Sequence, residues 1–225
     1  MEGDVLMSPV TVVFLDKNRI QFYESRDGTL VSLEVPETIM RDLEIANPTA
    51  LGESVKTFLN QNHISASVSI LVFSDTVVLT RELTGTREEK ELEFQKFLDA
   101  VPFENILSRR YVFGEHDIAI AMPRAGFEPL IAILQEARFP VMAVVPTFTL
   151  GPMKNKRWLD AEMGKFVAGK AETIAAESIT PMVNVPVSTG ARSPMIVRGI
   201  SRAAIGIAVF ILLIIVLFFL VIGRI

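Results

Sequence analysis

Side chains that commonly act in catalysis or bind metals are scarce in this sequence. It contains no cysteine and only two histidines, which excludes a thiol nucleophile and a cysteine-based metal site. His63 and His116 lie far apart, and neither has a histidine or carboxylate at the spacing of metal ligands. We expect His63 to lie near the C-terminal end of a helix and His116 to be solvated in a hairpin turn.

Carboxylates gather in one stretch, REEKELE, which runs from Arg87 to Glu93. Glutamate and lysine residues four positions apart on a helix attract each other, so we expect a solvated helix face here and not an acid–base pair. The glycine-rich loops that bind phosphate and the GxSxG motif of a catalytic serine are absent from the sequence. We therefore expect no catalytic residue, no metal site and no cofactor, and we do not expect an enzyme.

An alternation of strands and helices would position these side chains. Short runs that are rich in β-branched residues, or that alternate apolar and polar residues, predict strands. The turn at Arg26–Gly28 separates two of them, because Asp-Gly accommodates a positive φ. The predicted strands are 10–15, 19–24, 30–35, 68–73, 76–83, 109–114, 117–122 and 141–147.

Three helices are predicted between the strands. The first begins near Pro48, because proline is favoured at the first helical position. The second begins at Thr86, which can form a capping box with Glu89, and it ends before Pro102. The third covers about 128–137. Together these elements predict one α/β (or α+β) domain over residues 8–150.

The composition changes after residue 150. Residues 151–178 predict an amphipathic helix, which Gly164 and Gly169 each weaken by about 1 kcal/mol. Residues 179–201 contain proline, serine, threonine and glycine, and this composition is typical of a linker. The net charge of the whole chain is −4 and it has no basic stripe with aromatic residues, so we expect no nucleic-acid binding.

A long apolar run follows the linker. Residues 203–222 carry no charged or polar side chain, and as a helix they would be about 30 Å long, the thickness of a bilayer's hydrocarbon core. Arg198 and Arg202 precede the run, whereas Arg224 alone follows it. The positive-inside rule therefore predicts a single-pass protein of the cytoplasmic membrane with its N-terminal domain in the cytoplasm.

The middle of the chain resembles the PilM family, the actin-like proteins of type IV pilus assembly. The resemblance lies in VSILVFSDTVVLTREL, in REEKELEFQKFLDAVPFENI, and in YVFGEHDIAIAMPRAGFEPLIAILQEARFPVMAVVPTFTLG. In that family an acid-rich helix ends in an aromatic-proline corner, for which this chain has Phe97, Pro102 and Phe103. The L component of type II secretion has a similar plan, in which an actin-like domain is followed by one membrane span.

The resemblance implies half of an actin-like fold, namely the first lobe with an inserted strand-helix-strand-strand module at about 86–146. The residues expected in the core of the module are Leu92, Phe97, Leu98, Ile131 and Leu134. The family's first hairpin carries an aspartate followed by small residues that hold nucleotide phosphates. Here Asp16 is retained, but Lys17 and Arg19 replace the small residues, so Asp16 is the only degenerate candidate for a nucleotide site.

We therefore expect a membrane-anchored scaffold of a type IV pilus or type II secretion-like machine of the inner membrane. Its implied partner is a peptide or helix of an inner-membrane platform component. A degenerate actin-like ATPase and a membrane tether of a cell-division complex are the alternatives, together with an unrelated tail-anchored protein.

Overall fold

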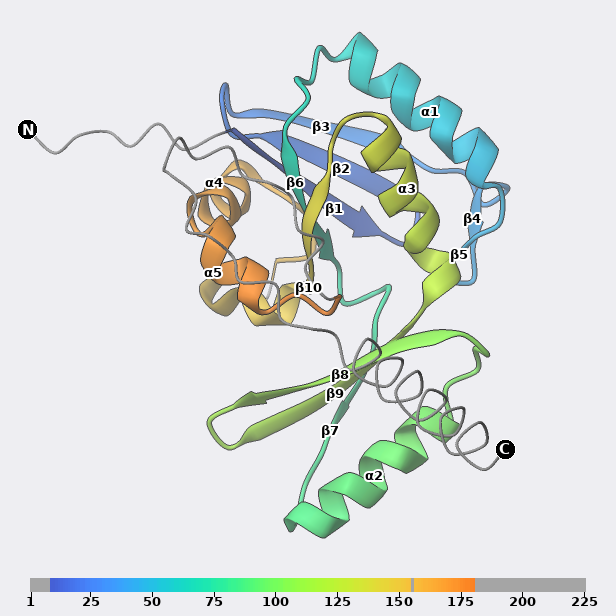
Figure 1. Cartoon of the computed structure of the whole chain (residues 1–225), viewed down its shortest axis with the longest axis vertical. Coiled ribbons are helices and arrows are strands. Elements are labelled where there is room, and N and C mark those ends of the chain that lie inside the picture. Colours follow the sequence, from blue (N-terminus) through green and yellow to red (C-terminus); the bar gives the residue numbers. More distant parts are fainter. Residues whose placement is uncertain (1–8, 155, 181–225) are drawn as a thin grey trace, which may run out of the picture. The chain divides into compact units, whose positions relative to one another are not determined.

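A five-stranded mixed sheet is the centre of the fold in the computed structural model, which describes residues 9–154 and 156–180 (Figure 1). Its strands are β1 (Val10–Asp16), β2 (Arg19–Glu24), β3 (Thr29–Glu34), β6 (Val68–Phe73) and β10 (Val141–Pro146). Their order is β10-β6-β1-β2-β3, in which β1, β2 and β3 are antiparallel neighbours, whereas β6 is parallel to β1 and β10 is parallel to β6. The predicted mixed α/β fold is confirmed, and every predicted strand is present with ends shifted by a few residues.

Tight turns join the first three strands. Asp16 pairs with Arg19 to close the first hairpin, and Gly28 has a φ of 72° in the second, as the Asp-Gly pair predicts. A two-strand hairpin that the sequence did not predict comes next, formed by β4 (Met40–Arg41) and β5 (Glu44–Ile45). It leads the chain into the first helix.

Helices α1 (Pro48–Gln61) and α3 (Glu128–Glu136) cover one face of the sheet (Figure 1). Helix α1 begins as predicted: Pro48 is at its start, and the Asn47 side chain accepts a hydrogen bond from the backbone N–H of Ala50 at 3.1 Å. The two helices contact each other where Gly52 lies against Ile133. The buried residues between helices and sheet include Val13, Ile20, Phe22, Leu51, Val55, Leu71, Phe73, Leu130 and Leu134.

The opposite face of the sheet is covered by α4 (Ala161–Gly169) and α5 (Ala171–Ala176), which follow the 3-10 segment η2 (Thr147–Met153). The helix predicted within 151–178 is thus two short helices separated at Lys170. Their apolar side chains pack on the sheet and include Leu159, Met163, Val167 and Ile174. The folded domain therefore continues beyond the predicted limit at residue 150, because these helices bury the second face of the sheet.

Gly164 brings α4 close to the sheet. A Cβ at this position would lie 2.3 Å from the buried ring of Tyr23, so no larger residue fits without movement. The sequence predicted Gly164 only as a weak point of a helix, whereas here the missing side chain makes the helix–sheet contact possible. Gly169 has no such role, since a Cβ there would have no heavy atom of another group within 4 Å.

An inserted module forms a second, three-stranded sheet in the order β7-β9-β8. It consists of β7 (Leu79–Glu82), α2 (Arg87–Asp99), β8 (Ile106–Phe113) and β9 (His116–Pro123), the expected strand-helix-strand-strand composition. The capping box of α2 is confirmed: Thr86 and Glu89 exchange side-chain to backbone hydrogen bonds of 2.7 and 3.3 Å. Both limits of the module differ from the expected 86–146: it begins earlier, with β7, and it ends earlier, because α3 and β10 belong to the five-stranded sheet and its core.

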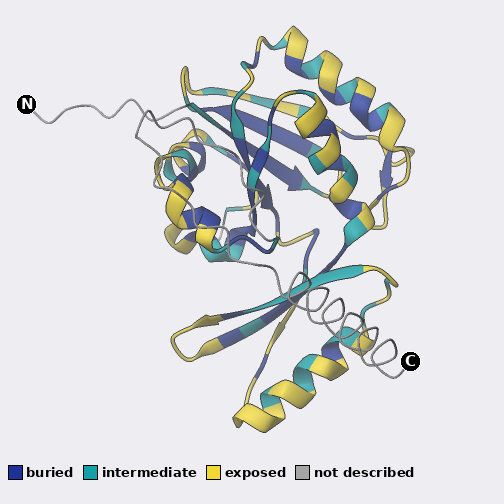
Figure 2. Cartoon of the chain, viewed as in Figure 1, coloured by how far each residue is buried: buried dark blue, intermediate teal, exposed yellow. Residues whose placement is uncertain are grey.

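Much of α2 is exposed (Figure 2), and the core of the module differs from the expected one. Phe97 is buried and Leu98 is half-buried against β7 and β9. The prediction for Leu92 is wrong: 56% of it is exposed, because it lies on the side of α2 that faces away from the sheet. Ile131 and Leu134 also do not belong here, since α3 carries them into the core of the five-stranded sheet.

The predicted C-terminal anchor lies outside the described residues. This applies to the apolar run at 203–222, to Arg198, Arg202 and Arg224, and to most of the linker predicted at 179–201. Ile179, at the start of that linker, is buried in the core. Across residues 9–154 and 156–180, no helix has the length and apolar character needed to cross a membrane.

Candidate functional site

Asp16, the one nucleotide-site candidate, lies at the end of β1 with both carboxylate oxygens engaged. One oxygen accepts hydrogen bonds from the Ser74 and Thr76 hydroxyls at 2.8 and 2.5 Å and from the Lys17 backbone N–H at 2.9 Å. The other oxygen accepts from the guanidinium of Arg19 at 3.4 Å. The carboxylate thus ties the first hairpin to the segment that leaves β6.

The electrostatics of Asp16 agree with this structural role. Burial alone would raise its pKa, but the hydrogen bonds from Thr76, Lys17, Ser74 and Arg19 outweigh burial and leave the pKa below its ordinary value. One oxygen is occupied by three donors, whereas the other has only the long contact with Arg19. The neighbouring donors stabilise the charged form of the carboxylate.

A hollow of about 540 Å³ opens beside Asp16. Its wall includes Arg19, Asp75, Lys156 and Trp158. Two of these charges have partners in the fold: Asp75 accepts a hydrogen bond from the Thr147 hydroxyl, and Lys156 forms ion pairs with Asp160 and Glu162. Trp158 is 56% exposed, whereas Phe166, the other aromatic residue of this region, packs on the core.

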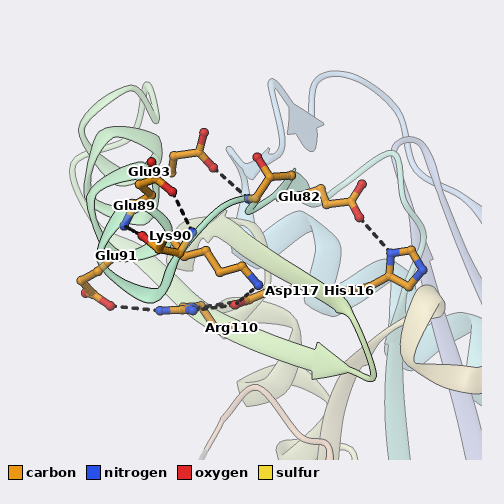
Figure 3. A network of polar contacts seen from close by, with 10 residues as sticks. Glu82, Glu89, Lys90, Glu91, Glu93, Arg110, His116 and Asp117 are labelled. Carbon is orange, nitrogen blue, oxygen red and sulfur yellow. Dashed lines mark hydrogen bonds and ion pairs between the residues drawn. The ribbon is translucent and has the colours of Figure 1, made fainter.

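The acidic stretch of α2 takes part in an ion-pair network with the module sheet (Figure 3). Arg110 donates two hydrogen bonds to Asp117, at 2.6 and 3.2 Å, and one to Glu91 at 3.0 Å, while Lys90 lies 3.7 Å from Asp117. The glutamate–lysine pairs predicted along the helix are thus replaced by pairs between the helix and the strands. The network fixes α2 to β8 and β9.

The predicted corner lies at the end of α2, and the two histidines lie after α1 and at the β8–β9 hairpin. Helix α2 ends before Pro102, as predicted; Phe97 packs beneath it, Phe103 is half-buried and Pro102 is exposed. His63 follows α1 with a φ of 54°, and His116 lies at the end of the β8–β9 hairpin, 2.8 Å from Glu82. Within the described parts of the chain, no three histidine, aspartate or glutamate side chains are close enough to hold a metal ion.

Two of the exposed large apolar residues in the described part of the chain lie near the tip of the β8–β9 hairpin. Val112 is 66% exposed and Phe113 is 38% exposed. Phe113 stacks on Tyr111 with ring centroids 5.9 Å apart, and Phe148 of η2 meets both rings edge-on, at 6.3 Å from Phe113 and 5.4 Å from Tyr111. The module thus meets η2 through three aromatic rings.

A groove of about 460 Å³ is lined by Phe113 and Phe148. Its lining is largely apolar and includes Ile118, while His116 and Lys154 add polar groups. We name it the hairpin groove. Sequence reasoning did not find it, because Phe113 and Phe148 belong to segments that only the tertiary fold brings together. The available signal was the phenylalanine at the end of β8, next to the polar turn at Glu115-His116.

Comparison with known proteins gives remote similarities. No protein-family model and no curated protein matches this sequence. The chain is similar to the solved structure of a PilM–PilN type IV pilus biogenesis complex, at 13% identity and a TM-score of 0.46 over 63% of this chain and 48% of that one.

Two further solved structures are similar at comparable levels. One is the cytoplasmic domain of EpsL, an inner membrane component of the type II secretion system of Vibrio cholerae (13% identity, TM-score 0.39, 64% of this chain and 57% of that one). The other is a Bacteroides thetaiotaomicron protein with an actin-like ATPase fold and unknown function (12% identity, TM-score 0.37, 63% and 53%). The chain spans about half the length of these structures, and at such values none of them assigns it a function.

Proposed function

We propose that this chain is a membrane-anchored scaffold that binds partner proteins of a type IV pilus or type II secretion-like machine and catalyses no reaction. The observation that carries the proposal is the contrast between its two candidate sites. The carboxylate of Asp16 accepts hydrogen bonds from its own neighbours, whereas the hairpin groove presents the exposed ring of Phe113. Exposed apolar surface of this kind typically marks a site of protein interaction.

The machine is inferred from the sequence. The PilM-like stretches and the corner at Phe97, Pro102 and Phe103 support an actin-like first lobe, and the strand-helix-strand-strand module has the composition that such a lobe requires. The uncharged run at 203–222 and the flanking arginines support a single span with this domain in the cytoplasm. A cytoplasmic domain held at the inner membrane is placed to receive a short cytoplasmic peptide or helix of a platform protein.

The hairpin groove suits an apolar peptide. Aromatic side chains bury large areas with little loss of conformational entropy, which is why a few of them dominate many interfaces. Phe113 and Phe148 form the walls of the groove and Lys154 adds a cation to it. We infer that one or two apolar side chains of the partner enter the groove and pack against these rings.

Site-specific photo-crosslinking of the full chain in its native cells tests this site. A photoreactive phenylalanine analogue at Phe113 is expected to form a crosslink with an inner-membrane pilus or secretion platform protein. The same analogue at Leu30, which is 39% exposed on β3, is the matched control and should give no such product. Phe113→Glu should abolish the partner's co-purification, whereas Leu30→Glu should not. Equal crosslinking at both positions, or a partner from the division machinery at Phe113, would overturn the proposal.

The non-catalytic part of the proposal has its own test. Calorimetric titration of the full chain in detergent micelles with Mg-ATP at millimolar concentration is expected to give no binding heat. Binding at micromolar ATP that Asp16→Ala abolishes would instead support the degenerate ATPase. The hollow beside Asp16, with Arg19 and Trp158 in its wall, is the place where such binding would occur.

A further inference from the structure

The four residues after α5, Glu177–Thr180, lie against the edge of the five-stranded sheet. The backbone N–H of Ile179 donates to the carbonyl oxygen of Val144 on β10 at 2.8 Å, and the N–H of Val144 donates to the Ser178 hydroxyl oxygen at 3.0 Å. Both Ser178 and Ile179 are buried. The segment therefore satisfies the open edge of β10 in the manner of a short additional strand.

The same segment is held by the inserted module. The Tyr111 hydroxyl on β8 donates to the carbonyl oxygen of Glu177 at 2.8 Å, and the Arg109 guanidinium donates to the carbonyl oxygen of Ser178. Arg109 also lies over the Tyr111 ring, 4.8 Å from its centroid. Burial raises the pKa of Tyr111 well above its ordinary value, so its hydroxyl remains a donor at any physiological pH. Residues 177–180 thus join β10 to β8.

These contacts lie away from the two points where the chain enters and leaves the module. The chain enters the module just before Leu79 and leaves it after Pro123, and strand pairing places both crossings at one end of the small sheet, since Leu79 pairs with Ala121 and Ile106 pairs with Pro123. Tyr111 is five residues beyond Ile106 on β8, a distance of roughly 16 Å along a strand. Glu177–Thr180 is therefore an attachment of the module that lies well away from its two covalent crossings.

Tyr111 also connects this attachment to the hairpin groove. Its ring stacks on Phe113 and meets Phe148 edge-on, and these two rings form the walls of the groove. A displacement of Glu177–Thr180 would release the Tyr111 hydroxyl and shift the ring that supports both walls. An unbroken series of contacts therefore leads from β10 through Glu177–Thr180 and Tyr111 to Phe113 near the tip of the hairpin.

We propose that Glu177–Thr180 is a latch that fixes the inserted module against the five-stranded sheet and couples the edge strand β10 to the hairpin groove. Release of the latch would leave the module held by its two crossings and by the packing of Tyr111, Ile120 and Met122 in the main core, and would loosen its far end and the groove there. Coupling between β10 and the groove requires one element whose position depends on both of them, and the latch is that element. The use of the groove by a partner rests on the proposed function, whereas the latch does not.

The absence of cysteine makes the latch directly measurable. In the full chain in detergent micelles, spin labels on Glu53→Cys of α1 and Glu115→Cys at the hairpin tip report the distance between main domain and module; both residues are exposed. The double variant Tyr111→Phe, Ser178→Ala removes two latch hydroxyls and keeps the ring. We expect amide exchange at Val144 and Ile179 to rise by on the order of tenfold. We also expect the distance distribution to broaden toward a second population.

Two further variants complete the test. Ile179→Pro removes the backbone N–H that donates to the carbonyl oxygen of Val144. It should broaden the distance distribution in the same way, although it removes a different hydrogen bond of the latch. Tyr23→Phe removes the hydroxyl of the only other tyrosine, which lies on the α4 side of the sheet, and should leave the distance unchanged. Two results would overturn the proposal. One is amide exchange at Val144 that stays slow in both latch variants. The other is a distance between the two spin labels that does not change in these variants. No partner is needed for the measurement, so its failure would leave the crosslinking test of the groove unaffected.

Discussion

At the scale of single residues, two aspartates show how neighbouring donors decide what a carboxylate does. Asp16 accepts from two hydroxyls, a backbone N–H and a guanidinium, and this closes a hairpin. Asp117 is buried in the module and accepts from Arg110, with Lys90 nearby. In both cases the fold provides the compensating groups, so the charge stabilises local structure.

Asp117 gives a pH-dependent prediction. The hydrogen bond from Arg110 lowers its pKa against the opposing effect of burial, with a further contribution from Lys90. Because the folded pKa lies below the unfolded one, the stabilisation is present above the ordinary aspartate pKa of about 3.9 and is lost as the pH falls through the folded pKa. Asp117→Asn should therefore cost about 1–3 kcal/mol at pH 7 and progressively less toward pH 3.

Denaturant unfolding of both proteins between pH 7 and pH 3 measures this difference. Asp27→Asn, at the exposed turn before β3, is a control that should change stability little at any pH. A cost of Asp117→Asn that is the same at pH 7 and pH 3 would show that the charge of Asp117 is not the stabilising feature.

At the scale of elements, α4 shows that one residue type can have opposite effects within one helix. Gly164 and Gly169 carry the same intrinsic penalty of about 1 kcal/mol relative to alanine. Gly164 faces the ring of Tyr23 at a distance that admits no Cβ, whereas Gly169 has free space around it. Packing therefore reverses the propensity argument at the first position and leaves it intact at the second.

The two glycines form a matched pair of substitutions. Gly164→Ala should destabilise the protein by about 1–3 kcal/mol, because the new methyl group forces α4 away from the sheet or displaces Tyr23. Gly169→Ala should be neutral or stabilise by up to about 1 kcal/mol through helix propensity. Urea unfolding midpoints of the two variants give the comparison. Equal effects would mean that α4 does not pack on Tyr23 as described.

At the scale of the whole molecule, the proposed function requires the domain to be held at a membrane. The apolar run at 203–222 and the arginines before it are features of the sequence outside the described residues. Carbonate extraction of cells should leave the full chain in the membrane pellet, and deletion from Ala203 onward should release it. Protease added outside spheroplasts should leave the N-terminal domain intact, because the positive-inside rule places it in the cytoplasm. Digestion of that domain would contradict the orientation.

Features with local causes were predictable from the sequence. The capping box at Thr86 and Glu89, the turn at Gly28 and the start of α1 at Pro48 each depend on residues a few positions apart, and all are present. The strands were predicted for the same reason, since their apolar patterns repeat along the chain. The α/β class follows from that order of strands and helices.

Only the tertiary structure decided which distant segments meet. The donors of Asp16 include Ser74 and Thr76, about sixty positions along the chain, and the groove requires Phe113 to meet Phe148. The pairing of β10 with β6 likewise moved residues assigned to the module into the main core, and Ile179 became a buried contact of β10 instead of the start of a linker. No local pattern encodes such contacts, because each depends on how strands separated by long connections align in one sheet.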